Sequence, residues 1–152
     1  MIAGTIFNNL VETLNNDANL KEYIKFVFAG RRYAIEPDSI PCIMVEPTAN
    51  NEIERDFGQI TKVFFKVDVI AIVGAPADPD YTIVGDKAMG YIGVLDIEND
   101  IRACLSGSNT LGDSVEDIQI METIINEAVI NNAIIREVKI PIKVLYRQNN
   151  GV

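Results

Sequence analysis

The clearest pattern along the chain is the alternation of apolar and polar residues between positions 60 and 73. The apolar members are Val63, Phe65, Val67, Val69 and Val73, and the polar members between them are Lys62, Lys66 and Asp68. A period of two is typical of a β-strand with one buried face, so we expect a strand over residues 60–73. The proline- and aspartate-rich segment 75–80 ends it.

Two other segments have apolar residues at helical spacing. The segment 5–28 carries Ile6, Leu10, Leu14, Leu20, Ile24 and Val27, and its polar run at 15–17 is where such a helix would divide. The segment 82–105 carries a stripe of Val94, Ile97, Ile101 and Leu105. We therefore expect one helix, or a helix and a shorter second one, at the start of the chain and another helix near its middle.

The remaining segments favour extended structure. Residues 42–46 form a short apolar run between Pro41 and Pro47, which excludes a long helix. The polar segment 50–59 is typical of a loop or a hairpin arm. We expect two last strands, at 115–126 and 134–147.

The segment between these two predicted strands, and the second strand itself, each contain a residue type that constrains the backbone. Asn131-Asn132 suits a hairpin turn because asparagine tolerates positive φ. Pro141 cannot donate a hydrogen bond, so we expect an edge or a bulge there.

The predicted element order is α-β-β-α-β-β. Because strands and helices do not alternate as βαβ units, we expect the α+β class, with a mainly antiparallel sheet of about four strands and helices packed on it. The chain length of 152 residues suits one domain over residues 1–152.

The charge is strongly acidic, with 22 acidic and 13 basic residues and a formal net charge of −9. This excess disfavours ordinary binding to phosphate backbones, although a channel through which DNA slides without sticking would tolerate it. No apolar run approaches the ~18 residues of a membrane span, and the first residues lack the pattern of a signal peptide. We therefore expect no contact with a membrane.

Residues that carry catalysis are scarce. The chain has no histidine, which removes the commonest general base and zinc ligand, and it has no phosphate-binding loop, dinucleotide fingerprint or nucleophile elbow. Cys42 and Cys104 have neither redox nor zinc spacing, so we expect two reduced, buried thiols. We predict no enzyme, no catalytic residue, no metal and no cofactor, although a carboxylate pair or a lysine stays open as a catalyst.

Two acidic clusters would be the metal candidates. They are Asp78, Asp80 and Asp86, and Asp113, Glu116 and Asp117. Neither matches the ligand pattern of an EF-hand loop, so solvated loop charge is the favoured interpretation.

Basic residues give the candidate interaction site. Arg31 and Arg32 follow the first helix, Arg55 lies in the polar segment, and Lys62 and Lys66 lie on the polar side of a strand. Lys139, Lys143 and Arg136 are expected to line the last strand in the same way. On an acidic chain such rows suit charge-complementary contacts between subunits, whereas the alternative is a solvated strand face. We take Arg31, Arg32, Arg55, Lys62 and Lys66 as the predicted subunit or tube interface.

The layout resembles the tail-terminator (tail-completion) proteins of tailed bacteriophages and prophages. The features that carry the resemblance are GRRY at 30–33, SIPCIMVEP at 39–47, the strand 60–73, DIENDIRACL at 96–105 and the final strand pair. The resemblance covers residues 4–147, and it lies more in element order and length than in invariant residues.

The resemblance implies a structural virion protein without catalytic residues or cofactor. Such a protein forms a homohexameric ring that caps the tail tube, ends its polymerisation and provides the head-joining surface. Its partners would be itself, the tail tube protein and the head–tail connector, with DNA only as passing cargo. Its location would be the virion tail, assembled in the bacterial host cytoplasm. By analogy, residues 50–59 and the strand from Ile60 would face the tube or a neighbouring subunit.

Three alternatives stay open. One is another part of the same particle, such as a head-closure ring in the neck or a minor tail protein. The second, from a different class, is an α+β domain that binds a small ligand or a peptide and is a monomer or dimer. The third is a carboxylate-based enzyme, which needs paired acids in a concave site.

Overall fold

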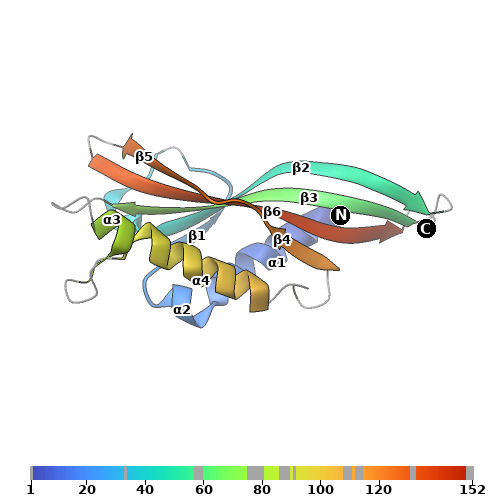
Figure 1. Cartoon of the computed structure of the whole chain (residues 1–152), viewed down its shortest axis with the longest axis horizontal. Coiled ribbons are helices and arrows are strands. Elements are labelled where there is room, and N and C mark those ends of the chain that lie inside the picture. The colour runs from blue at the N-terminus through green and yellow to red at the C-terminus, as the bar shows by residue number, and fades with distance from the viewer. Residues whose placement is uncertain are drawn as a thin grey trace.

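One twisted sheet runs along the molecule, and helices cover one of its faces (Figure 1). The computed structural model describes residues 2–32, 34–56, 60–74, 81–85, 90, 92–107, 111, 115–130 and 133–149. The strands are β1 (Phe26–Ala29), β2 (Cys42–Asp56), β3 (Ile60–Gly74), β4 (Asp117–Ile120), β5 (Ile124–Ile130) and β6 (Ala133–Asn149). The helices are α1 (Ile2–Asn16), α2 (Ala18–Lys21), α3 (Tyr81–Val84) and α4 (Val94–Gly107), and Pro37–Ser39 forms a short 3-10 turn.

The sheet is six-stranded and mainly antiparallel. Its order is β1-β2-β3-β6-β4, and β5 also pairs with β6, next to β4 along the same edge. Four of the pairings are antiparallel, and β1 lies parallel to β2. The predicted α+β class is confirmed, whereas the predicted count of about four strands is too low.

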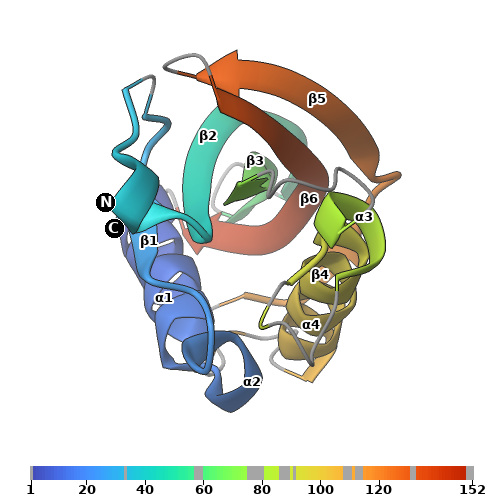
Figure 2. The same ribbon diagram turned by 90° about the vertical axis from the view of Figure 1, so that its left-hand side faces the viewer.

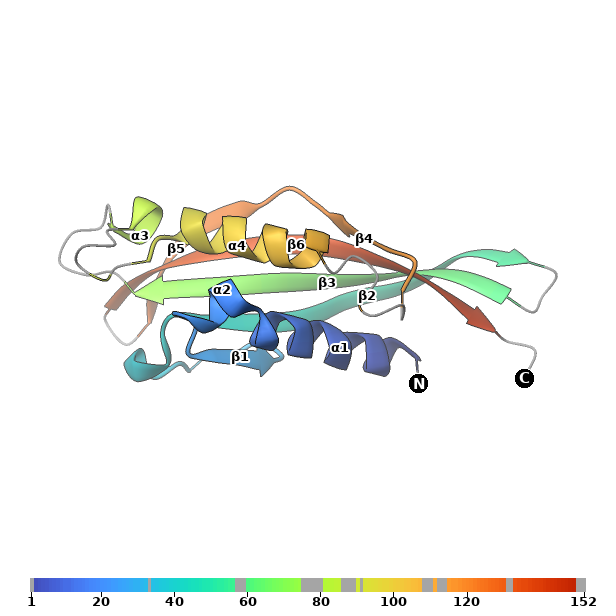
Figure 3. The same ribbon diagram turned by 90° about the horizontal axis from the view of Figure 1, so that it is seen from below.

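Three strands are unusually long and give the molecule its elongated form. β2 and β3 each have 15 residues and β6 has 17, which at ~3.3 Å per residue corresponds to about 50 Å. Seen from below, their far ends project beyond α1 and α4 as a three-stranded arm (Figure 3). The arm consists of the end of β2, the start of β3 and the end of β6.

The main core lies between the helices and the sheet. Seen end-on, α1 and α4 lie side by side beneath the curled sheet (Figure 2). α1 buries Ile6, Leu10 and Leu14 there, and α4 buries the stripe of Val94, Ile97, Ile101 and Leu105 that the sequence predicts. The sheet contributes the alternate positions of β3 and β6, among them Val67, Val69, Ile140 and Val144. The expected one-sided burial of β3 is therefore confirmed.

A second, smaller core lies on the opposite face, at one end of the sheet. It consists of Ile35, Cys42, Met44, Ile70, Ile72 and Ile135, with Phe28 and Ile40 packed against it. The segment between β1 and β2 supplies Ile35 and Ile40 and so covers this end of the face. This explains why the alternation in β3 stops at Ile70, since from there on both faces of the strand are buried.

The first predicted helix is shorter than expected. Asp17 leaves the helical conformation, and its Oδ1 accepts hydrogen bonds from the Asn19 and Leu20 amides at 3.0 Å, which starts α2 as an N-cap. The predicted division at 15–17 is thus confirmed. The extension to Phe28 is wrong, because the aromatic and β-branched run at 26–28 pairs with β2 as β1.

The second predicted helix, over 82–105, is two helices. α3 ends at Val84, and the glycines that follow, Gly85 and Gly90, adopt φ of 70° and 77°, a left-handed conformation that interrupts a helix. Gly93 brings the start of α4 against α3, because a Cβ there would lie 2.3 Å from the Ile83 carbonyl oxygen. Glycine therefore breaks the helix and lets its two parts pack closely.

The proline-bracketed strand continues much further than predicted. β2 passes through Pro47 and runs on to Asp56, so the described part of segment 50–59, residues 50–56, belongs to a hairpin arm with β3, one of the two predicted alternatives. Residues 57–59 lie outside the described residues. Pro47 is tolerated because the register shifts between Pro47 and Ala49, a bulge, and because β1 pairs with β2 only as far as Val45.

Pro141 interrupts the neighbouring strand instead of its own. β6 continues through it without a bulge, paired with β3 at Asp68. On the other side of β6 the ladders with β4 and β5 stop at Ile142 and Lys139, so Pro141 lies at the expected edge locally. The Pro141 carbonyl accepts a hydrogen bond from the Met121 amide at 2.8 Å. Since a strand residue points its N–H and C=O toward the same neighbour, the missing N–H lies on that side too. There the predicted strand 115–126 divides into β4 and β5.

Candidate subunit-interaction surface

The face of the sheet opposite the helices, called the open face below, carries much of the positive charge of the chain. It consists of the even-numbered residues of β3 and their partners on β6, and five of the 13 basic residues lie on it: Lys62, Lys66, Lys139, Lys143 and Arg147. Strand geometry explains this grouping, because cross-strand partners point to the same face. Cations thus gather on one face of a chain whose net charge is −9.

A groove of about 450 Å³ crosses the middle of the open face. Its lining comes from the bulge in β2, from β3 and β6, and from the link between β4 and β5: Thr48, Lys66, Asp68, Met121, Glu122, Pro141, Ile142 and Lys143. The groove exists because β2 bulges on one side and the β4–β5 edge breaks at Pro141 on the other.

Two lysines and two acidic residues, Asp68 and Glu122, line the groove. Lys66 and Lys143 are direct partners across β3 and β6, and like charges at opposed positions destabilise a sheet. The Lys143 ammonium lies 5.7 Å from the centre of the Phe64 ring, a cation–π contact. The ion pairs between described residues include neither lysine. Both lysines are half-buried and share the groove with two carboxylates, so the charge of its lining is balanced.

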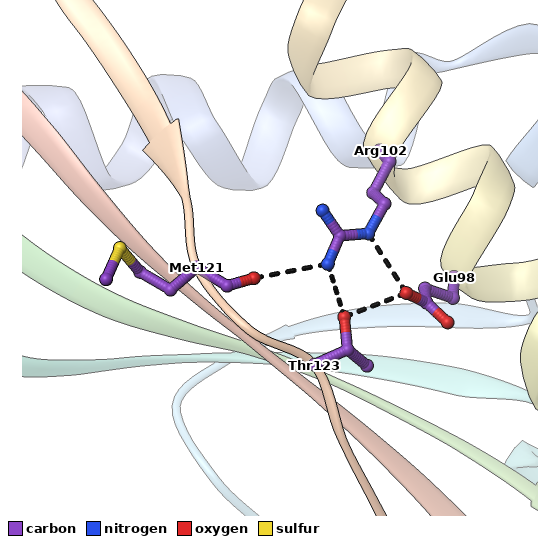
Figure 4. A network of polar contacts seen from close by, with 4 residues as sticks. All are labelled: Glu98, Arg102, Met121 and Thr123. Atoms are coloured by element: carbon purple, nitrogen blue, oxygen red, sulfur yellow. Dashed lines mark hydrogen bonds and ion pairs between the residues drawn. The ribbon is translucent and has the colours of Figure 1, made fainter.

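A polar network holds the outer wall of the groove against α4 (Figure 4). The Arg102 guanidinium donates to the Met121 carbonyl at 3.1 Å, to the Thr123 hydroxyl at 2.5 Å and to Glu98 Oε1 at 3.0 Å. The Thr123 hydroxyl in turn donates to Glu98 at 2.8 Å. Two residues of α4 thereby fix the link 121–123, which has no ladder partner of its own, and place Met121 and Glu122 beside the lysines.

The structure separates the two predicted arginines that follow β1. Arg31 Nη2 lies 3.3 Å from Glu137 Oε2, and Glu137 is only 8% exposed, so this arginine balances a buried charge inside the molecule. Arg32 is exposed, and its guanidinium stacks 5.1 Å from the centre of the Phe28 ring. Both lie at the covered end of the open face, away from the groove.

The other predicted interface residues belong to the arm and the groove. Lys66 lines the groove, whereas Lys62 lies four residues earlier on β3, half-buried and partnered with Arg147 in register. Arg55 pairs with Thr61 in the β2–β3 hairpin, and its side chain lies outside the described part of the chain. The structure thus brings one of the five predicted residues into the groove.

The expectation for Arg136 is wrong. Arg136 is partnered with Val73 and lies on the helix-facing side of β6. The odd-numbered residues of β6 point to the open face, and the even-numbered ones, including Arg136, point to the helices. It forms a 3.2 Å ion pair with Glu127 of β5. Lys139 and Lys143 do lie on the open face, as the sequence predicts.

The outer side of the helix layer is acidic. Glu22, Asp96 and Asp100 line a hollow between α2 and the start of α4, and among the described residues no lysine or arginine lines it. The Tyr23 hydroxyl donates to Asp100 at 2.5 Å. Burial raises the pKa of Tyr23 well above its usual range, and the hydrogen bond to Asp100 raises it further. Tyr23 therefore stays protonated and holds Asp100, whereas the half-buried Asp96 forms no side-chain hydrogen bond or ion pair with another described residue.

The thiols lie away from this surface and are free. Cys42 is buried in β2 and Cys104 in α4, as predicted. Burial raises the pKa of Cys42 to about 11, and burial together with the nearby Asp17 raises that of Cys104 to about 12. Both side chains are therefore protonated and weakly nucleophilic at neutral pH.

Among the described residues, no group of three acidic or cysteine side chains could hold a metal ion. The predicted acidic cluster at Asp78, Asp80 and Asp86 lies outside them, as does Asp113 of the other cluster. Glu116 of that second cluster is bound to Arg147.

No model of a known protein family matches the chain, and no curated protein sequence matches it either. Among the described residues, no helix is long and apolar enough to cross a membrane.

Several groove residues escaped the sequence-based prediction. Lys143 was placed on the correct face, but its position opposite Lys66 depends on the β3–β6 register, which no local pattern fixes. Met121 and Glu122 fall inside what the sequence presents as one strand. The available signal was Pro141, whose missing N–H marks the place where a neighbouring strand has to break.

Proposed function

We propose that the protein is a structural, self-assembling component of a phage tail. In this proposal, copies close into a homohexameric ring that caps the tail tube, stops its growth and offers a surface to the head–tail connector. The ring works without catalysis, metal or cofactor. DNA passes through it, and the net charge of −9 keeps the passing phosphates from binding.

The observation that carries the self-assembly is the difference between the two sides of the molecule. One side presents the five basic residues of the open face, with Asp68 and Glu122 among them in the groove, and the other presents carboxylates on the helix layer. Two unlike, charge-complementary surfaces on opposite sides favour a head-to-tail contact over a symmetric pair. Repetition of such a contact gives a ring when the rotation closes.

The assignment to a tail rests on element order. An initial helix, a long β2–β3 hairpin, a helix at 94–107 and a final group of strands occur in the order on which the sequence resemblance to tail-terminator proteins is based, with β1 and α3 in addition. The three-stranded arm that projects beyond the helices suits contact with a tube or a neighbour (Figure 3). A head-closure ring or a minor tail protein would use the same surfaces, and binding to isolated tail tubes as against empty heads distinguishes them.

The groove also supports a second candidate from a different class. A volume of about 450 Å³ lined by two lysines, two acidic side chains and apolar side chains would suit a small polar ligand. This candidate predicts a monomer or dimer with saturable binding, which a titration followed by calorimetry would detect.

The test of the proposal is the mass of the purified chain over a concentration series, together with negative-stain images of any large species. We expect closed rings of about 100 kDa, the mass of six copies of a 16.8 kDa chain. A chain that stays monomeric at every concentration and also fails to bind isolated tail tubes would exclude the ring.

A further inference from the structure

The strand β5 is an edge of the sheet whose outer side has no strand partner in the described part of the chain. Its ladder there is with β6 alone, and Figure 1 shows it as the outermost strand at the end of the sheet opposite the arm. Residues 124–127 are all exposed, with Ile124 at 44% and Ile125 at 42%. The outer edge of β5 and both of its faces are therefore open to a partner along this stretch.

The other described edge strands carry features that hinder the addition of a strand. β1 and β4 have only four residues each. The part of β2 beyond its ladder with β1 contains Pro47, two register shifts and the charged residues Glu52, Glu54 and Arg55. Short length, proline, bulges and charge are the means by which native sheets block unwanted pairing. β5 differs, because it has seven residues, no proline, an unshifted register with β6 and a single charged residue, Glu127.

The backbone of β5 alternates between groups that bond β6 and groups that point away from it. The Pro141 carbonyl of β6 accepts a bond from Met121, so the odd-numbered residues of β6 point their N–H and C=O toward β4 and β5. These odd residues lie opposite the even residues of β5. The even residues of β5 therefore bond β6, whereas the N–H and C=O groups of Ile125, Glu127 and Val129 point outward.

The outward groups are arranged symmetrically about Glu127. If two β5 strands meet antiparallel about a two-fold axis at Glu127, this residue lies opposite Glu127 of the second copy, and Ile125 lies opposite Val129 of the second copy. Each outward N–H then faces an outward C=O. The strand sequence IINEAVI has two apolar residues at each end and polar or small ones between them. Apolar residues therefore meet apolar residues across the axis, which stabilises a strand pair.

The two Glu127 carboxylates are the like charges that this pairing brings together. Each of them already lies 3.2 Å from Arg136 Nη2 of its own copy, and the Glu127 side chain is 53% exposed. The axis thus collects two acidic and two basic side chains, so the charge at the contact is balanced.

We propose that the free edge of β5 pairs antiparallel with β5 of a second copy, which joins two sheets across a two-fold axis. The contact is isologous, because both copies offer the same strand. Main-chain hydrogen bonds hold the strands together, and the exposed side chains of Ile124 and Ile125 are covered in the process. The pairing does not rest on the proposed ring, which draws on the open face and the helix layer instead of this edge.

The variant Glu127→Cys tests the register, since residue 127 is the position of β5 that lies opposite itself. Oxidation is expected to link it into disulfide dimers on non-reducing electrophoresis, because opposed residues of a hydrogen-bonded pair have Cα atoms ~5.5 Å apart, within disulfide reach. The matched control Asn126→Cys is expected to link far less, since its counterpart lies diagonally, roughly 7–8 Å away. The native Cys42 and Cys104 are buried, so the wild type is expected to stay unlinked.

The variant Ile125→Pro tests the backbone pairing. It removes an outward N–H and leaves the β5–β6 ladder intact, because proline is tolerated on an edge strand where its nitrogen faces away from the sheet. Over a concentration series in sedimentation velocity, we expect the wild type to form a species of about 34 kDa, twice the 16.8 kDa of one chain, and Ile125→Pro not to form it. The control Ile125→Val keeps the N–H and is expected to behave like the wild type. Circular dichroism and urea unfolding confirm that each variant is folded.

The outcomes judge the pairing separately from the ring. A folded Ile125→Pro chain that dimerises like the wild type, or a Glu127→Cys chain that links no more than Asn126→Cys, would reject the pairing. If the wild type forms no dimer but Ile125→Pro loses its binding to isolated tail tubes, β5 takes a strand of the tube protein and the pairing between copies is again rejected. An Ile125→Pro chain that loses the dimer and still closes rings supports the pairing and shows that the ring does not need it.

Discussion

Replacement of Leu10 by alanine is expected to lower the free energy of unfolding by about 3–5 kcal/mol. Leu10 is 0% exposed in the middle of α1, between Ile6 and Leu14 in the main core. The truncated side chain no longer gains the free energy of moving those methyl and methylene groups out of water. It also leaves a cavity that the long, rigid sheet cannot close. Urea unfolding followed by circular dichroism measures the change.

The control for Leu10 is Ile2→Ala on the same helix, where the side chain is 40% exposed. We expect this substitution to lower the free energy of unfolding by less than ~1 kcal/mol, because the Ile2 side chain buries little apolar surface on folding. Equal losses in the two variants would mean that α1 does not pack on the sheet as described.

Replacement of Arg31 by methionine is expected to lower the free energy of unfolding by about 2–3 kcal/mol. Removal of one partner of a fully buried ion pair costs ~3–5 kcal/mol, and the expected loss is smaller here because the Arg31 side chain is 30% exposed. The loss arises from Glu137, whose carboxylate would stay almost buried without its counter-charge. The additional change Glu137→Gln removes that charge and is expected to recover much of the stability. Urea unfolding of the single and double variants gives the coupling energy.

The neighbouring Arg32 is the natural control for Arg31. Arg32→Met removes a similar exposed charge and a cation–π contact, which is worth about 0.5–1 kcal/mol. Equal effects of the two substitutions would contradict the structural role given to Arg31, and restored stability in a double variant of Arg32 and Glu137 would contradict it as well.

Much of the fold was predictable wherever one face of an element is buried. The stripe at Val94, Ile97 and Ile101 fixes α4, and the alternation at 63–69 fixes the start of β3, because burial imposes the period of the element on the sequence. The predictions failed where tertiary pairing overrides local spacing. Residues 26–28 continue a helical spacing, yet their parallel pairing with β2 makes them β1.

The site was less predictable than the fold. Lys66 was chosen because it lies on a polar strand face, which composition and alternation reveal. The groove around it arises from a bulge after Pro47, a strand break opposite Pro141 and a network at Arg102. These features depend on register and on contacts between segments far apart in the sequence, so no local pattern encodes them.

The growth of tail tubes in the presence of the purified chain tests the proposed function. Tube protein would be polymerised with and without the chain, and tube lengths and tube ends would be examined by negative-stain microscopy. We expect shorter tubes with a ring at one end, and no further growth when fresh tube protein is added. Tubes that grow to the same lengths, resume growth freely and carry no added ring at either end would contradict the proposal.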